Sequence, residues 1–134
     1  MTVQYSEKVS VNINTSTLAE IDLLVDNGYY SNRSDFINQA VREGLQKHQS
    51  TLDRLIDQHE TRQGHWWFLG VSSLGNLELE KARAQGLEVT YTGYGVLVID
   101  KDIDKELLFS VVRSMKFKGK VIGEQAVKDH YGLK

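Results

Sequence analysis

The chain has 134 residues, of which 40% are hydrophobic and 25% are charged, and its formal net charge is −2. These values exclude a collagen, a coiled-coil rod and a largely disordered chain, and no apolar run is long enough for a membrane helix. The sequence contains no cysteine, so disulfides, thiolate metal sites and cysteine nucleophiles are excluded. The first ten residues lack the apolar segment of a secretion signal, so we expect a cytoplasmic protein that does not engage membranes.

The first element is an expected strand at residues 8–13, where polar and apolar residues alternate. A period of two predicts a strand with one buried face. The apolar face carries Val9, Val11 and Ile13. The opposite, polar face carries Lys8, Ser10 and Asn12.

Two helices are expected after this strand. Asn14 suits the N-cap of the first, with its side chain accepting a hydrogen bond from the amide of Thr17, and Asn27-Gly28 ends that helix. The second begins at Ser31 or Asn32, since an acidic residue three positions after Asn32 makes a variant capping box. Its apolar stripe continues to about residue 61, which favours one long helix over two helices broken near residues 49–50.

The composition changes after residues 61–64, and the second half reads as alternating strands and helices. Gly70, Gly95 and Gly119 occupy similar places in three strand-like segments and are 25 and 24 residues apart. This period favours stacked βα units, with a single βαββαβ sandwich that has a hairpin at residues 92–95 as the alternative. The expected strands span residues 66–71, 87–99 and 116–122, and the expected helices span residues 76–85, 103–114 and 124–131.

A strand followed by two helices has no partner strand within residues 8–48. Because a lone strand leaves its backbone hydrogen bonds unmade, we expect it to pair with the same strand of a second copy. Such a homodimer has an antiparallel two-stranded ribbon with four helices over its apolar face. A ribbon of this kind has the dimensions to enter the major groove of double-stranded DNA.

Residues 8–48 resemble the ribbon-helix-helix repressors of the CopG type. The matching segments are KVSVNI, TLAEIDLLVDNGYYS and NRSDFINQAVREGL, and residues 28–37, at the turn into the second helix, are the most specific part. The nickel-responsive regulators share this half and a similar length. Their histidine-rich, cysteine-containing ligand set has no counterpart here, so nickel sensing does not carry over.

The resemblance implies two sets of DNA-contacting residues. The outward residues of the strand read base edges, for which lysine, serine and asparagine are chemically suited. The start of the second helix anchors a phosphate, with Arg33 either adding a charge or pairing with Asp35 or Glu43. The implied base-reading residues are Lys8, Ser10 and Asn12. The implied phosphate-binding residues are Ser31, Asn32, Arg33 and Ser34.

Other chemically notable residues give weaker indications. The four histidines lack the i, i+4 spacing of a helical metal site, so we expect no metal. The glycines lack the spacing of a phosphate loop or a dinucleotide-binding motif, and no Ser/His/Asp constellation is indicated, so we expect no cofactor and no enzymatic activity. Trp66-Trp67 lines either a ligand pocket or a core or interface. The row Lys116, Lys118 and Lys120 is either a solvated strand face or a phosphate contact.

The sequence therefore predicts an α+β protein with an N-terminal ribbon-helix-helix dimer and a C-terminal α/β domain. The expected divisions are a DNA-binding and dimerisation domain at 1–48, a helical extension at 49–63, and an oligomerisation or partner-binding domain at 64–134. The predicted function is repression of transcription at a DNA operator by a homodimer or a higher oligomer, with a protein or small ligand as a partner of the second half. The alternative is an antitoxin that represses its own operon and sequesters a toxin through residues 50–134.

Overall fold

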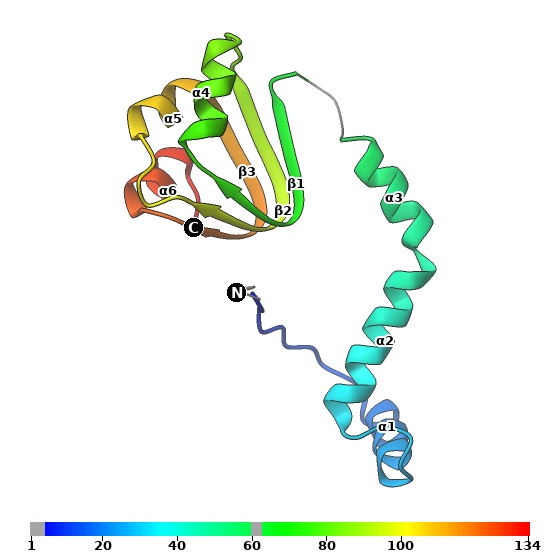
Figure 1. The fold of residues 1–134 in the computed structure, drawn as a ribbon. Helices are drawn as coiled ribbons and strands as arrows, with labels where there is room; N and C mark the ends of the chain where they lie inside the picture. Colours follow the sequence, from blue (N-terminus) through cyan, green and yellow to red (C-terminus); the bar gives the residue numbers. More distant parts are fainter. Residues whose placement is uncertain (1–4, 60–62) are drawn as a thin grey trace. The chain divides into compact units, whose positions relative to one another are not determined.

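A computed structural model describes residues 5–59 and 63–134 of the chain (Figure 1). The chain divides into two compact units, residues 1–55 and 56–134. Part of the boundary that the sequence predicts at residues 61–64 lies outside the described residues. The combination of helices with a β-sheet confirms the α+β class.

The N-terminal unit contains α1 (Thr15–Asp26) and α2 (Arg33–Lys47). The side chain of Asn14 caps α1 as expected, but it accepts from the amide of Ser16 at 2.8 Å instead of that of Thr17. This difference follows from the short asparagine side chain, which bonds readily to the backbone two residues ahead. Gly28 follows α1 with a φ of 83°, a left-handed conformation that favours glycine and ends the helix.

The expectation of one long second helix is wrong. Helix α2 ends at Lys47, and a separate helix, α3 (Gln49–Asp57), follows. The break is at His48, whose amide bonds to the carbonyl of Leu45 three residues back, at 3.0 Å, instead of four residues back. This tightened turn interrupts the helix just before the position at which the alternative placed a break.

Residues 5–14 form neither helix nor strand in the single chain. The strand expected at residues 8–13 has no partner strand in this copy, and a strand exists only when its backbone groups are paired. Val9 and Val11, expected on the buried face, are 77% and 68% exposed. The apolar side of this segment is therefore uncovered in one chain.

The C-terminal unit is a three-stranded parallel sheet with strand order β1-β2-β3. Successive strands step in one direction, and right-handed crossovers then place the connecting helices on one face of the sheet, as Figure 1 shows. Stacked βα units are thus confirmed and the sandwich with a hairpin at residues 92–95 is wrong, because β2 runs through them without a turn. The elements are β1 (His65–Leu74), α4 (Asn76–Ala84), β2 (Val89–Ile99), α5 (Lys105–Val111), β3 (Val112–Ile122) and α6 (Gln125–Tyr131).

The three glycines of the sequence repeat lie directly beside one another in the sheet. Gly70 pairs with Gly95, and Gly95 pairs with Gly119. All three have positive φ values, and a Cβ atom on Gly95 or Gly119 would overlap the carbonyl oxygen of the glycine on the preceding strand. The repeat therefore marks a row in which Gly95 and Gly119 have no room for a side chain beside the preceding strand, whereas Gly70 needs glycine only for its backbone conformation.

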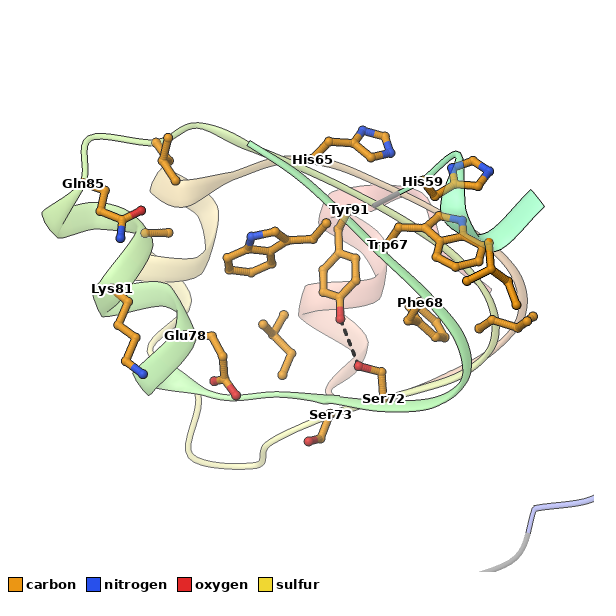
Figure 2. A pocket seen from close by; sticks show the side chains of 16 residues that line it. His59, His65, Trp67, Phe68, Ser72, Ser73, Glu78, Lys81, Gln85 and Tyr91 are labelled. Carbon is orange, nitrogen blue, oxygen red and sulfur yellow. Dashed lines mark hydrogen bonds between the residues drawn. The ribbon is translucent and has the colours of Figure 1, made fainter. Parts of the chain in front are cut away.

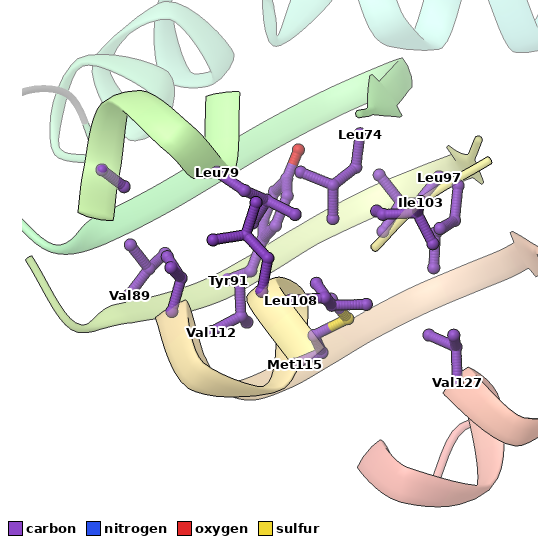
Figure 3. Packing of buried hydrophobic residues seen from close by; sticks show 14 of the residues in the cluster. Leu74, Leu79, Val89, Tyr91, Leu97, Ile103, Leu108, Val112, Met115 and Val127 are labelled. Carbon is purple, nitrogen blue, oxygen red and sulfur yellow. The ribbon is translucent and has the colours of Figure 1, made fainter. Parts of the chain in front are cut away.

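The core lies between the sheet and helices α4, α5 and α6, and Figure 3 shows its packing. Helix α5 is shorter than expected and β3 correspondingly longer, because the chain becomes extended at Val112, where it pairs with Val89. The Tyr131 hydroxyl donates to the carbonyls of Leu108 and Val112, at 3.2 and 2.8 Å, and so connects α6 to the α5–β3 junction. The side chains with the lowest exposure are Leu74, Leu79, Leu97, Leu108, Val89, Val112 and Val127.

Candidate DNA interface

The three implied base-reading residues, Lys8, Ser10 and Asn12, are all exposed in the segment that precedes α1. Asn12 lies two residues before the cap of α1, so the capped helix start fixes where this segment leaves the unit. The side chains are free to meet another molecule. A ribbon requires two chains and the structure describes one, so the role of these residues in reading bases stays a prediction.

The implied phosphate anchor forms a well-defined helix start. The Asn32 side chain accepts from the amide of Asp35 at 2.8 Å, and the Asp35 carboxylate accepts from the amide of Ser31 at 2.9 Å. This is close to the expected capping box, but the carboxylate returns to Ser31 and not to Asn32. The first-turn amides of Arg33 and Ser34 have no partner within a helix by geometry, and both residues are exposed. These two amides are therefore the donors best placed for an anion.

Arg33 has a partner that the sequence did not indicate. Its guanidinium donates two hydrogen bonds to the Asp22 carboxylate on α1, both of 2.8 Å, so the expected partners Asp35 and Glu43 are wrong. These hydrogen bonds hold the pKa of Asp22 below its ordinary value and raise the pKa of Arg33. The pair fixes the start of α2 against α1 and neutralises the positive side-chain charge of the phosphate anchor.

The histidines of the C-terminal unit contact other side chains, and the His59 ring stacks on Trp67 with ring centres 4.5 Å apart. The His130 ring stacks on Phe109 with ring centres 3.8 Å apart, and His65 Nε2 lies 3.2 Å from the Thr92 hydroxyl. Within residues 5–59 and 63–134, no three histidine or acidic side chains gather closely enough to hold a metal ion.

The tryptophan pair lines a groove of about 1090 Å³ beside β1 and α4 (Figure 2). Trp66 also packs against the core, as one of the two interpretations of the pair predicts, and a ligand in the groove stays a prediction. The Tyr91 hydroxyl lies 3.1 Å from the Ser72 hydroxyl in this groove, and burial raises the pKa of Tyr91. Glu78 also lines the groove.

An exposed segment with alternating polar and apolar residues stands before a pair of helices, and the second helix begins with amides that can bind an anion. This is the layout of the strand-helix-helix class of DNA-binding modules. The sequence model of the Ribbon-Helix-Helix transcriptional regulator family matches residues 4–128, and the chain belongs to this family. It is therefore a transcriptional regulator of the DNA-binding kind. The match spans both units, so the C-terminal sheet is part of the family's architecture.

No curated protein and no solved structure matches the chain. Every helix in the described parts of the chain is too short or too polar to cross a membrane.

Proposed function

We propose that the protein is a homodimeric repressor that reads an operator with a two-stranded antiparallel ribbon, one strand from each copy. The observation that carries this proposal is the near absence of a core in the N-terminal unit. Among its described residues, Ile21 alone is a buried hydrophobic side chain, at 5% exposure. Val41 and Leu45, which follow helical apolar spacing on α2, are both 54% exposed. A unit with so little buried apolar area needs a second copy to fold stably.

The ribbon explains both exposed faces of residues 8–13 at once. Pairing of two strands satisfies their backbone groups, and the helices of both copies cover Val9 and Val11. Since side chains alternate across a strand, Ser10 and Asn12 then face away from the helices and into the groove. Asparagine can bond both the acceptor and the donor of adenine, which is the contact that carries sequence information.

The phosphate contacts rest on backbone amides in this proposal. Arg33 is held by Asp22, so the α2 start binds the DNA backbone through the amides of residues 33 and 34 and the positive end of the helix. Residues 1–50 contain four basic and six acidic residues, so little non-specific attraction to DNA is expected. Affinity for the operator then depends on base reading and on dimer formation.

A folded C-terminal unit supports the regulator over the antitoxin. The tail of a typical antitoxin is short and gains structure only when it binds the toxin. Residues 65–131 here contain six helices and strands around a core of their own. We assign this unit to assembly of the repressor.

The test is a paired titration with an operator selected from a random duplex library by the unaltered protein. Asn12→Ala and Ser10→Ala should reduce the preference for the operator over a scrambled duplex by about 5- to 150-fold, which corresponds to about 1–3 kcal/mol. Ser34→Glu should weaken binding to both duplexes equally, because it places a negative charge at the phosphate anchor. Asn38→Ala, the same change at an exposed position of α2, is the matched control and should leave the preference unchanged.

The proposal fails if Asn12→Ala and Ser10→Ala keep the full preference of the unaltered protein while their melting curves stay the same. Base reading would then belong to another surface of the chain.

A further inference from the structure

One face of the β-sheet is largely bare among the described residues of the C-terminal unit. At one end of this face the Trp67 ring is covered by His59, on which it stacks with ring centres 4.5 Å apart. Helices α4, α5 and α6 lie on the other face. On the uncovered side, Leu69, Val71 and Tyr94 are 54%, 60% and 52% exposed. Val96 and Val98 are half-buried beside them. We call these five residues the open face.

The register of the sheet shows that these residues form one continuous apolar surface. Leu69 pairs with Tyr94, and Val71 pairs with Val96, so side chains from β1 and β2 lie next to each other. Purely parallel sheets occur almost only with both faces covered. An apolar patch on such a sheet therefore indicates an interface.

We propose that the open face packs against the open face of the second copy in the same dimer. This inference rests on the proposed dimerisation through the N-terminal ribbon, which holds two copies of the sheet in one molecule. Tethering of this kind gives an effective concentration in the millimolar range without any further contact.

The charges on the sheet suit a second copy. Strands β1 and β2 contain no aspartate, glutamate, lysine or arginine, so two copies that overlap on these strands place no like charges opposite each other. The only charged row of this side is Lys116, Lys118 and Lys120 on β3, which is an edge strand. The lysines then form a hydrated border along one side of the apolar contact.

The size of the face explains why the tether matters. A ten-residue strand is about 33 Å long and strands are about 4.8 Å apart, so β1 and β2 present roughly 320 Å² per copy. Two copies together bury roughly 600 Å², which is below the about 1,000 Å² of a specific interface between free molecules. Such a contact is weak between free molecules and sufficient within a tethered dimer.

The test is site-directed crosslinking in the full-length protein, which has no native cysteine. Val71→Cys and Tyr94→Cys each place one thiol on the open face, and Glu80→Cys places one on the exposed side of α4 as the matched control. With a short bismaleimide at low micromolar protein, both open-face thiols should crosslink the two copies at least tenfold faster than the control. Leu69→Asp added to Val71→Cys should remove this advantage without changing the far-ultraviolet circular dichroism of the protein.

Sedimentation of the same samples separates the two proposals. A dimer in which Val71→Cys and Tyr94→Cys crosslink no faster than Glu80→Cys overturns the open-face contact and leaves the ribbon intact. A monomer overturns the proposed ribbon dimer, and the inference with it. If Leu69→Asp leaves the fast crosslinking unchanged, the two faces are close without an apolar contact and the inference is wrong.

Discussion

The glycine row of the C-terminal sheet gives a prediction whose size follows from the structure. Gly95 has a φ of 124°, and a Cβ atom there would overlap the carbonyl oxygen of Gly70 on the neighbouring strand. The backbone conformation costs an alanine about 1–2 kcal/mol, and pushing two paired strands apart costs about 1–3 kcal/mol more. Gly95→Ala should therefore destabilise the unit by about 2–5 kcal/mol.

Gly86→Ala is the matched control. Gly86 also has a positive φ, of 67°, but nothing lies within 4 Å of the position that its Cβ would take. This variant should lose only the conformational contribution, about 1 kcal/mol. For a unit of this size, each kcal/mol lowers the melting temperature by about 4–8 °C.

The assay is thermal unfolding of the full-length protein followed by tryptophan emission. Both tryptophans, Trp66 and Trp67, lie in the C-terminal unit, so the signal reports on that unit alone. Gly95→Ala should melt about 8–40 °C below the unaltered protein and well below Gly86→Ala. Equal and small shifts for the two variants would refute the close approach of the strands at the glycine row.

Two further predictions concern particular side chains. Burial raises the pKa of Tyr131 to about 12 from an ordinary value of 10, so the folded state holds this proton more tightly. The contribution of Tyr131 to the stability of the C-terminal unit should be complete below about pH 10 and should be lost as the pH rises towards 12. Tyr131→Phe should reduce this alkaline loss of stability and should cost about 1 kcal/mol at neutral pH. An identical alkaline loss in the variant would contradict this explanation. Asp22→Ala should release Arg33 for a phosphate and steepen the dependence of log K on log salt concentration by about 0.9 per chain. An unchanged slope would show that Arg33 does not reach the DNA backbone.

Local signals in the sequence were sufficient for most of the fold. Asn14 and Asn32 cap their helices, and the spacing of Gly70, Gly95 and Gly119 correctly favoured stacked βα units. The spacing is informative because each βα unit of the stack places its glycine at the same register position, beside the glycine of the neighbouring strand.

The features that sequence reasoning missed depend on contacts between distant residues. The Thr92–Gly95 segment has the composition of a turn, and only its neighbours on two other strands show that its glycines serve close packing. Asp22 meets Arg33 because α1 packs on α2, and no helical spacing connects residues eleven positions apart. The sequence also did not indicate the open face, because the order of residue types along β1 and β2 does not tell whether the outer side of the sheet is covered.

The central claim is that residues 8–13 become a strand only when two chains pair. Hydrogen exchange of the backbone amides in the full-length protein tests this most directly, since an unpaired extended segment exchanges at the rate of a free peptide. We predict that amides within residues 8–13 are protected at micromolar protein concentration, and that protection disappears with dilution as the dimer dissociates. Free-peptide exchange throughout this segment in a sample that sediments as a dimer would contradict the ribbon.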